Sequence, residues 1–177
     1  LGVPMGQDLP TNYEDHAFNF DFMPDEFKAD RSKMRASLID AIHQRNQSRS
    51  VWGWKYPRAN IYLNQILEHV RRPHLICVLR DPLASSLRPL SRKNSRAKSG
   101  KITSPIKLME QHLAWQNRNL EIIRKANCPS LICSYEKAIT NPVGFVTEMA
   151  DFIDLGSSDQ CIADAVDQIK PGSYIQA

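Results

Sequence analysis

The sequence predicts an α/β fold with a mainly parallel sheet flanked by helices. Three short apolar runs read as strands, at Val51–Trp54, Leu75–Leu79 and Leu131–Ser134, and segments with helical spacing alternate with them. Strands that alternate with helices are typical of a layered fold with a parallel sheet. At 177 residues the chain is long enough to bury a substantial core, so we expect one domain, residues 1–177.

The first half of the chain opens with a loop that carries aromatic residues, from Pro10 to Pro24. An amphipathic helix follows, and apolar residues at helical spacing mark its buried face: Phe27, Met34, Leu38 and Ile42. The short strand at 51–54 ends at Lys55, and a helix from about Asn60 to Val70 leads to the next strand. Because Leu75–Leu79 is continuously apolar, we expect this strand to be buried on both faces.

Asp81 and Pro82 follow that strand, where the N-cap and the first residue of a helix belong. Pro89 is expected to interrupt this helix, and the basic, glycine-containing stretch that runs to Lys101 is expected to be a mobile loop.

A long helix is predicted from about Pro105 to Lys125, with these residues at helical spacing: Leu108, Leu113 or His112, Trp115 and Ile122. After the strand at 131–134, helices near Pro142–Ile153 and Ser158–Ile169 complete the chain.

Composition sets modest bounds on function. The 23 Lys and Arg residues against 19 Asp and Glu residues give a net charge of +4, which permits acidic ligands without indicating nucleic acid. The four cysteines have no CxxC spacing, so neither a zinc site nor a disulfide framework is predicted, and reduced thiols favour a cytoplasmic protein. No apolar run approaches the roughly 18 residues that span a bilayer, and the start has no signal-peptide layout.

Polar side chains stand at the ends of all three predicted strands. Lys55, Arg80 and Tyr135 each lie at or just after a strand's carboxyl end, so we expect them to converge on one edge of the sheet, where ligands of such folds bind. Backbone N–H groups at the start of the helix after Arg80 would face the same place. A guanidinium beside a helix N-terminus suits a phosphate or a sulfate.

Three segments together resemble consecutive signatures of the sulfotransferases that use 3′-phosphoadenosine 5′-phosphosulfate. They are Trp54–Pro57 (Trp-Lys-Tyr-Pro), Leu75–Pro82 (Leu-Ile-Cys-Val-Leu-Arg-Asp-Pro) and Cys133–Pro142. The resemblance extends to Leu1–Gly6 and Tyr13–Asp15, and so covers nearly the whole chain. It implies a P-loop-type layered fold and transfer of a sulfuryl group to a hydroxyl or amine of a small-molecule or glycan acceptor. The co-product would be adenosine 3′,5′-bisphosphate, and no metal is required.

The resemblance also implies roles for single residues. Arg80 would bind the 3′-phosphate of the nucleotide through its bidentate fork. The family usually has a serine eight residues later, where this sequence has Arg88; either Arg88 supplies a second cation, or Ser85 or Ser86 supplies the hydroxyl, or the site is degraded. Tyr135 matches a tyrosine that contacts the adenine in some members.

Two residues would serve the transfer step. Lys55 matches a lysine near the transferred group, where it would offset charge on the bridging oxygen as the bond breaks. Glu14 matches an early-loop carboxylate that removes the proton from the acceptor, and His16 is the rival base.

The family's Arg-Ser-Gly-Thr type of loop, which cradles the 5′-phosphosulfate, occurs nowhere in this sequence. We therefore expect the 177 residues to be an N-terminally truncated piece with little or no activity of its own. Such a piece would expose a sheet edge through which it could associate with another copy. Bacterial relatives are cytoplasmic, whereas eukaryotic glycan-modifying relatives face the Golgi lumen.

Two other interpretations of the function remain open. A small-molecule or nucleotide kinase needs a Gly-Lys-Ser or Gly-Lys-Thr loop, which is not visible. A non-catalytic anion- or nucleic-acid-binding domain would use a tract of basic residues: Arg88, Arg92, Lys93, Arg96, Lys98, Lys101 and Lys107. No aromatic residue lies between Tyr62 and Trp115, so this tract lacks platforms for base stacking and nucleic acid is not the expected partner.

Overall fold

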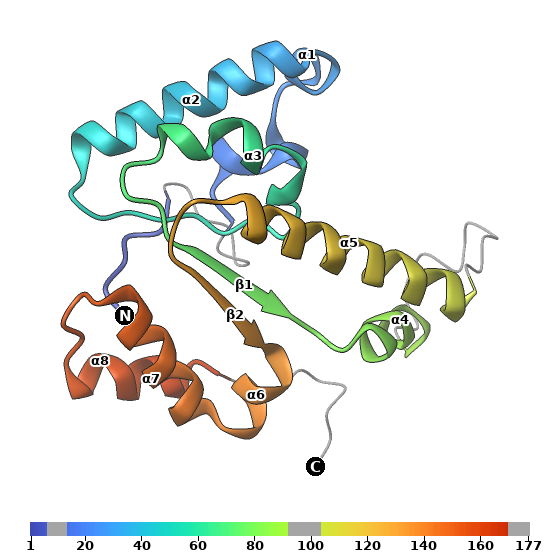
Figure 1. The fold of residues 1–177 in the computed structure, drawn as a ribbon, viewed down its shortest axis with the longest axis vertical. Helices are drawn as coiled ribbons and strands as arrows, with labels where there is room; N and C mark the ends of the chain where they lie inside the picture. The colour runs from blue at the N-terminus through green and yellow to red at the C-terminus, as the bar shows by residue number, and fades with distance from the viewer. Residues whose placement is uncertain (7–13, 92–103, 170–177) are drawn as a thin grey trace. The chain divides into compact units, whose positions relative to one another are not determined.

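A computed structural model describes residues 1–6, 14–91 and 104–169 of the chain, coloured in Figure 1. Contacts divide it into two compact units. Unit 1 consists of Leu1, His74–Ile123 and the chain from Pro129 onward, and unit 2 consists of Gly2–Pro73 and Arg124–Cys128. The expected mixed α/β fold is confirmed, with a two-stranded parallel sheet flanked by helices. Most of the stretch expected to be a mobile loop lies outside the described residues.

The sheet belongs to unit 1 and consists of β1 (Leu75–Leu79) and β2 (Ser130–Ser134). The two strands pair in parallel, with Leu75 opposite Ser130 and Leu79 opposite Ser134 (Figure 1). The predicted bounds of β1 are confirmed, and β2 begins one residue earlier than predicted. Because the first and last residues of β1 pair with the first and last residues of β2, both strands end at the same edge of the sheet.

The described part of unit 1 also contains helices α4 (Pro82–Ser91), α6 (Tyr135–Thr140), α7 (Pro142–Ile153) and α8 (Asp159–Asp167), together with nearly all of α5 (Pro105–Lys125). The start of α4 is as predicted, since the Asp81 carboxylate accepts a hydrogen bond from the Ala84 N–H at 2.6 Å. The expected interruption at Pro89 is wrong, because α4 continues to Ser91. Pro89 lies close to the helix end, where its missing N–H removes a single intrahelical hydrogen bond.

The expectation that β1 is buried on both faces is also wrong. Ile76 and Val78 are 37% and 51% exposed, although they share a face with Leu131 and Cys133 of β2. On that face, the described helices cover β2: Cys133 packs in a cluster with Phe145 of α7. The β1 half of the face has no such cover in the described part of the chain.

Helix α5 lies against the other face of β1 with polar residues. The Gln116 side-chain amide donates to the carbonyl of Arg80, and Asn119 hydrogen-bonds the Cys77 thiol, whose pKa burial raises overall. The apolar stripe expected for this helix is therefore only partly right. Ile122 is buried, but Leu113 and Trp115 are exposed.

The described part of unit 2 is built from one long helix, α2 (Arg31–Ser48), and shorter helical segments: η1 (His16–Phe18), η2 (Phe20–Phe22), α1 (Asp25–Ala29), η3 (Ala59–Ile61), α3 (Leu63–Ile66) and η4 (Leu67–His69). The expected amphipathic helix is divided at Asp30, whose carboxylate accepts hydrogen bonds from the N–H groups of Ser32 and Lys33 and so caps α2. The helix expected over 60–70 is broken into three segments. The strand expected at 51–54 is a single β-bridge between Gly53 and Met5.

The core of unit 2 joins α2, η1 and the segment that carries Trp52 and Trp54. Its fully buried side chains are Phe18, Leu38, Ile42, Tyr62 and Ile66. The Phe18 ring stacks on both tryptophans, with centroids 5.9 Å from Trp52 and 4.6 Å from Trp54. The Tyr62 hydroxyl donates to the Phe18 carbonyl at 2.7 Å, so the buried phenol is satisfied.

The buried Tyr62 side chain is expected to destabilise the fold at alkaline pH. Burial raises the pKa of this phenol well above the ordinary value of 10.0. The phenol therefore loses its proton at a lower pH in the unfolded chain than in the folded one. The contribution of Tyr62 to the free energy of unfolding is constant below pH 10 and falls as the pH rises further, by about 1.4 kcal/mol at pH 11. We expect Tyr62→Phe to unfold with a shallower loss of stability between pH 9 and 11 in urea titrations. Equal slopes for the variant and the parent would contradict the assignment.

Candidate functional site

The structure places the predicted site residues in two groups, one in each unit. The strand-end cluster lies in unit 1 and contains Arg80, Asp81, Tyr135 and Glu136. The loop cluster lies in unit 2 and contains Glu14, Asn19 and Lys55.

Arg80 and Tyr135 meet at the carboxyl edge of the sheet. Arg80 follows β1, and Tyr135 is the first residue of α6, directly after β2. The Arg80 Cζ atom lies 4.5 Å from the centroid of the Tyr135 ring, within the range of a cation–π contact. Because Gln116 binds the Arg80 carbonyl, the backbone at this point is held by α5 as well. The edge therefore presents a guanidinium stacked on an aromatic ring.

The helix start beside Arg80 differs from the expectation. The Asp81 N–H donates to Glu136 Oε1 at 2.9 Å, and the Ala84 N–H donates to the Asp81 carboxylate. Two of the backbone donors that were expected to face a ligand are thus bound by the protein's own carboxylates. Sequence reasoning missed Glu136, whose only signal was its place directly after Tyr135 in the third motif.

Glu136 ties the two strand ends together. Its second oxygen, Oε2, accepts from the Ser134 hydroxyl at 3.0 Å, so one carboxylate bridges the residues after β1 and the end of β2. Burial raises the pKa of Glu136, but hydrogen bonds from the N–H groups of Asp81 and Glu136 and from Ser134 outweigh it, and the net direction is downward. Glu136 is therefore a fixed negative charge next to Tyr135.

The serines and Arg88 all lie on α4. Ser86 is fully buried, and its hydroxyl donates to the Pro82 carbonyl at 2.6 Å, so it faces the interior of the fold. Ser85 is half-buried and is the serine of this pair with accessible surface. Arg88 is a helical residue near the end of α4, and the structure describes its backbone only.

Glu14 and Lys55 form the second predicted pair. Lys55 Nζ lies 3.6 Å from Glu14 Oε1, and the two side chains differ in exposure, 49% for Lys55 and 13% for Glu14. Glu14 Oε2 accepts a hydrogen bond from the Asn19 side-chain amide at 2.7 Å. The loop cluster thus presents a largely buried carboxylate beside a half-exposed ammonium group.

The residues after Glu14 fix the loop that carries it. Asp15 caps η1 by accepting from the Ala17 N–H, and its other oxygen pairs with Arg45 of α2 at 3.0 Å. Gly6 has a φ of +26°, and a Cβ there would collide with the Asp15 carboxylate. His16, the rival base, stacks on Phe22. Its Nε2 atom is buried and is not hydrogen-bonded within the described residues, so this nitrogen is not presented to solvent.

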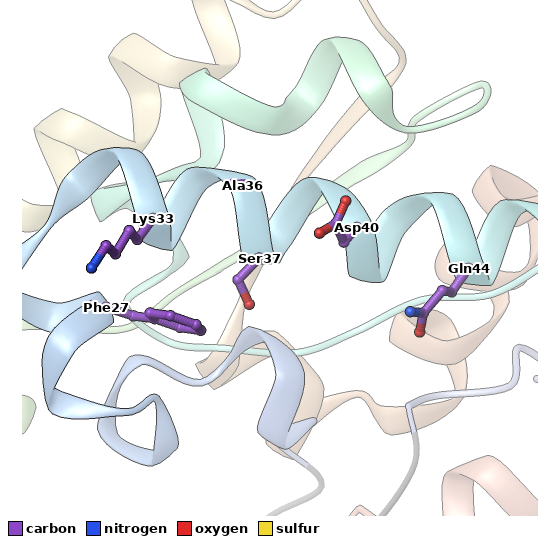
Figure 2. Close-up of a pocket in the computed structure, with 6 residues that line it drawn as sticks. All are labelled: Phe27, Lys33, Ala36, Ser37, Asp40 and Gln44. Atoms are coloured by element: carbon purple, nitrogen blue, oxygen red, sulfur yellow. The ribbon is translucent and has the colours of Figure 1, made fainter.

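An open pocket of about 450 Å³ lies along the outer face of α2. Figure 2 shows that its lining comes from α2 and, at one end, from Phe27 of α1; the α2 residues are Lys33, Ala36, Ser37, Asp40 and Gln44. None of them is a predicted site residue.

No group of three or more His, Cys, Asp and Glu side chains is arranged to hold a metal ion within residues 1–6, 14–91 and 104–169. Over the same ranges, no helix combines the length and the apolar character needed to cross a membrane. No family model, curated protein or solved structure matches this chain.

Proposed function

We propose that this chain is a sulfotransferase domain with a P-loop-type layered fold, which moves a sulfuryl group from 3′-phosphoadenosine 5′-phosphosulfate to a hydroxyl or amine of a small-molecule or glycan acceptor. The observation that carries the proposal is the Arg80 guanidinium over the Tyr135 ring at the carboxyl edge of two parallel strands. This is the edge at which α/β sheets bind ligands, and a nucleotide with a 3′-phosphate offers both an anion and an aromatic base to it.

In this proposal the strand-end cluster binds the nucleotide. Arg80 holds the 3′-phosphate through its planar fork, and Tyr135 lies next to the adenine. Ser85 and Arg88, on the helix that begins after Arg80, are the further phosphate contacts. Ser86 is the weakest of the proposed contacts, because its hydroxyl is already bound to Pro82.

The loop cluster then serves the transfer. Glu14 takes the proton from the acceptor, the acceptor oxygen or nitrogen forms the new bond to sulfur, and the bond from sulfur to the bridging phosphate oxygen breaks. Adenosine 3′,5′-bisphosphate leaves with the electron pair of that bond, and Lys55 offsets the charge that develops on the bridging oxygen. The contact between Glu14 and Lys55 supports their working as a pair.

We expect adenosine 3′,5′-bisphosphate to bind the chain in a calorimetric titration and Arg80→Ala to weaken this binding by at least about 10-fold, because a hydrogen bond to a charged group contributes about 1.5–3 kcal/mol. Arg58→Ala is the matched control, since Arg58 is an exposed arginine of unit 2 that pairs with Asp21. Equal affinity for Arg80→Ala and the parent would place the nucleotide elsewhere and remove the main support for the proposal.

A transfer assay separates the proposed enzyme from its alternatives. Radiolabelled sulfuryl donor with a panel of phenols, sugars and amines tests the transfer step. Because little or no activity is expected of these 177 residues, any label on an acceptor should be weak with the unsubstituted chain and absent with Glu14→Gln. Nucleotide binding without any transfer would support the nucleotide site alone, since an inactive piece of the enzyme and a non-catalytic anion-binding domain both give this result. Transfer of phosphate from ATP would favour the kinase.

A further inference from the structure

We infer that Asn19 is the positioning residue for Glu14: it holds one carboxylate oxygen so that the other faces Lys55. The inference rests on the proposed function for the role of Glu14, but the contact itself can be tested without any activity. Nothing in the sequence motifs singled out Asn19.

Both the oxygen and the nitrogen of the Asn19 side-chain amide form hydrogen bonds within the fold. The residue is 2% exposed, and its Oδ1 accepts from the Asp21 N–H at 2.9 Å, which caps η2. Its Nδ2 donates to Glu14 Oε2 at 2.7 Å. Because the Asp21 N–H requires an acceptor, Oδ1 must face it, and the NH₂ group is left facing Glu14. The hydrogen-bond network thus fixes which end of the amide meets the carboxylate.

This arrangement orients the carboxylate. With Oε2 held by Asn19, Oε1 is the oxygen that lies 3.6 Å from Lys55 Nζ. The backbone around the contact is fixed by the pairing of Asp15 with Arg45 and by the short helices that Asp15 and Asn19 cap. A base held in this way needs no rearrangement before it accepts a proton, which is what preorganisation contributes to catalysis.

The decisive variant is Asn19→Asp, which keeps the size of the side chain and an acceptor for the Asp21 N–H. It replaces the donor that faces Glu14 with a second carboxylate oxygen. The double variant Glu14→Gln with Asn19→Asp restores a hydrogen bond of reversed polarity, from the amide at 14 to the carboxylate at 19. It therefore repairs the contact without restoring a base at position 14.

The first readout is the ¹⁵N–¹H resonance of the Asn19 side-chain amide, compared between the unsubstituted chain and Glu14→Gln at one pH. We expect the substitution to shift it, because it replaces the carboxylate that accepts from Asn19 Nδ2 with an amide. Asn141 is the matched control, because it is also an asparagine N-cap, with Oδ1 on the Gly144 N–H. An Asn19 resonance that Glu14→Gln leaves unchanged overturns the inference.

The second readout pairs thermal stability with transfer. Asn19→Asp should lower both, with transfer reduced about 100-fold, the loss typical of a misplaced catalytic group. The double variant should recover the melting temperature but not the transfer rate. Parental transfer by Asn19→Asp at every pH would also overturn the inference. An Asn19 amide that responds to the change at position 14 in a chain without detectable transfer would support the contact between Asn19 and Glu14, which is tested independently of the transfer step.

Discussion

Arg45→Met is expected to lower the free energy of unfolding by about 3–5 kcal/mol. Arg45 pairs with Asp15 at 3.0 Å, and the side chains are only 11% and 3% exposed, so the substitution leaves an uncompensated charge inside unit 2. Methionine preserves most of the apolar stem of arginine, and the loss therefore reports the charge rather than a cavity. The Asp15 carboxylate still caps η1, but it has no cation beside it.

Urea unfolding followed by the fluorescence of Trp52 and Trp54, which lie in the core region of unit 2, measures this loss. Arg35→Met provides the comparison, since Arg35 pairs with Glu68 at 3.3 Å but both side chains are exposed, 44% and 73%. We expect that variant to change the unfolding free energy by at most about 1 kcal/mol. Similar effects of the two substitutions would show that the pair of Arg45 with Asp15 is solvated.

Phe18→Ala is expected to lower the free energy of unfolding by about 3–5 kcal/mol. The ring is fully buried and stacks on Trp54 and Trp52. Its removal leaves a cavity between the tryptophans and the loop that carries Glu14. We expect the variant to quench or shift the tryptophan fluorescence of the folded state as well.

Phe22→Ala is the control for Phe18→Ala, because it removes the same side chain from the same loop. Phe22 is 55% exposed and stacks on His16, so its loss should change stability by about 0.5 kcal/mol or less. Chemical denaturation of both variants gives the comparison. A Phe18→Ala protein as stable as Phe22→Ala would contradict the packing of this core.

The sequence was sufficient to predict the elements whose signals are local. An apolar run of five residues gave the bounds of β1, and prolines at the first helical position gave the starts of α4, α5 and α7. The buried positions Met34, Leu38 and Ile42 followed from helical spacing. Each of these signals is decided within one element.

Elements decided by tertiary contacts were predicted poorly. Trp52 and Trp54 alternate as in a strand, but these side chains pack on Phe18 and the backbone forms one bridge, to Met5. On α5, the helical spacing included Trp115 and either Leu113 or His112, but Leu113 and Trp115 are exposed. The contacts with the strand region come from polar residues: Asn119 hydrogen-bonds Cys77 of β1, and Gln116 binds the Arg80 carbonyl just after it. Polar residues can face a sheet when they find partners on it, and a sequence does not show those partners.

The candidate site shows the same difference between residues with a sequence signal and residues placed by tertiary contacts. Arg80 and Tyr135 could be predicted to meet because parallel strands end together. Asn19 and Glu136 could not, because their roles depend on which backbone N–H group or carboxylate the fold brings to them. Hydrogen bonds between distant residues leave no periodic pattern in a sequence.

The parallel pairing of β1 with β2 has a consequence for the order of folding. The partners Leu75 and Ser130 are separated by a long stretch of chain that includes α5. Closing a loop of this length costs about 3.5 kcal/mol of chain entropy beyond the constant for any loop. The helices form within microseconds from local contacts, so we expect the sheet, and with it the meeting of Arg80 and Tyr135, to be among the last features to appear during refolding.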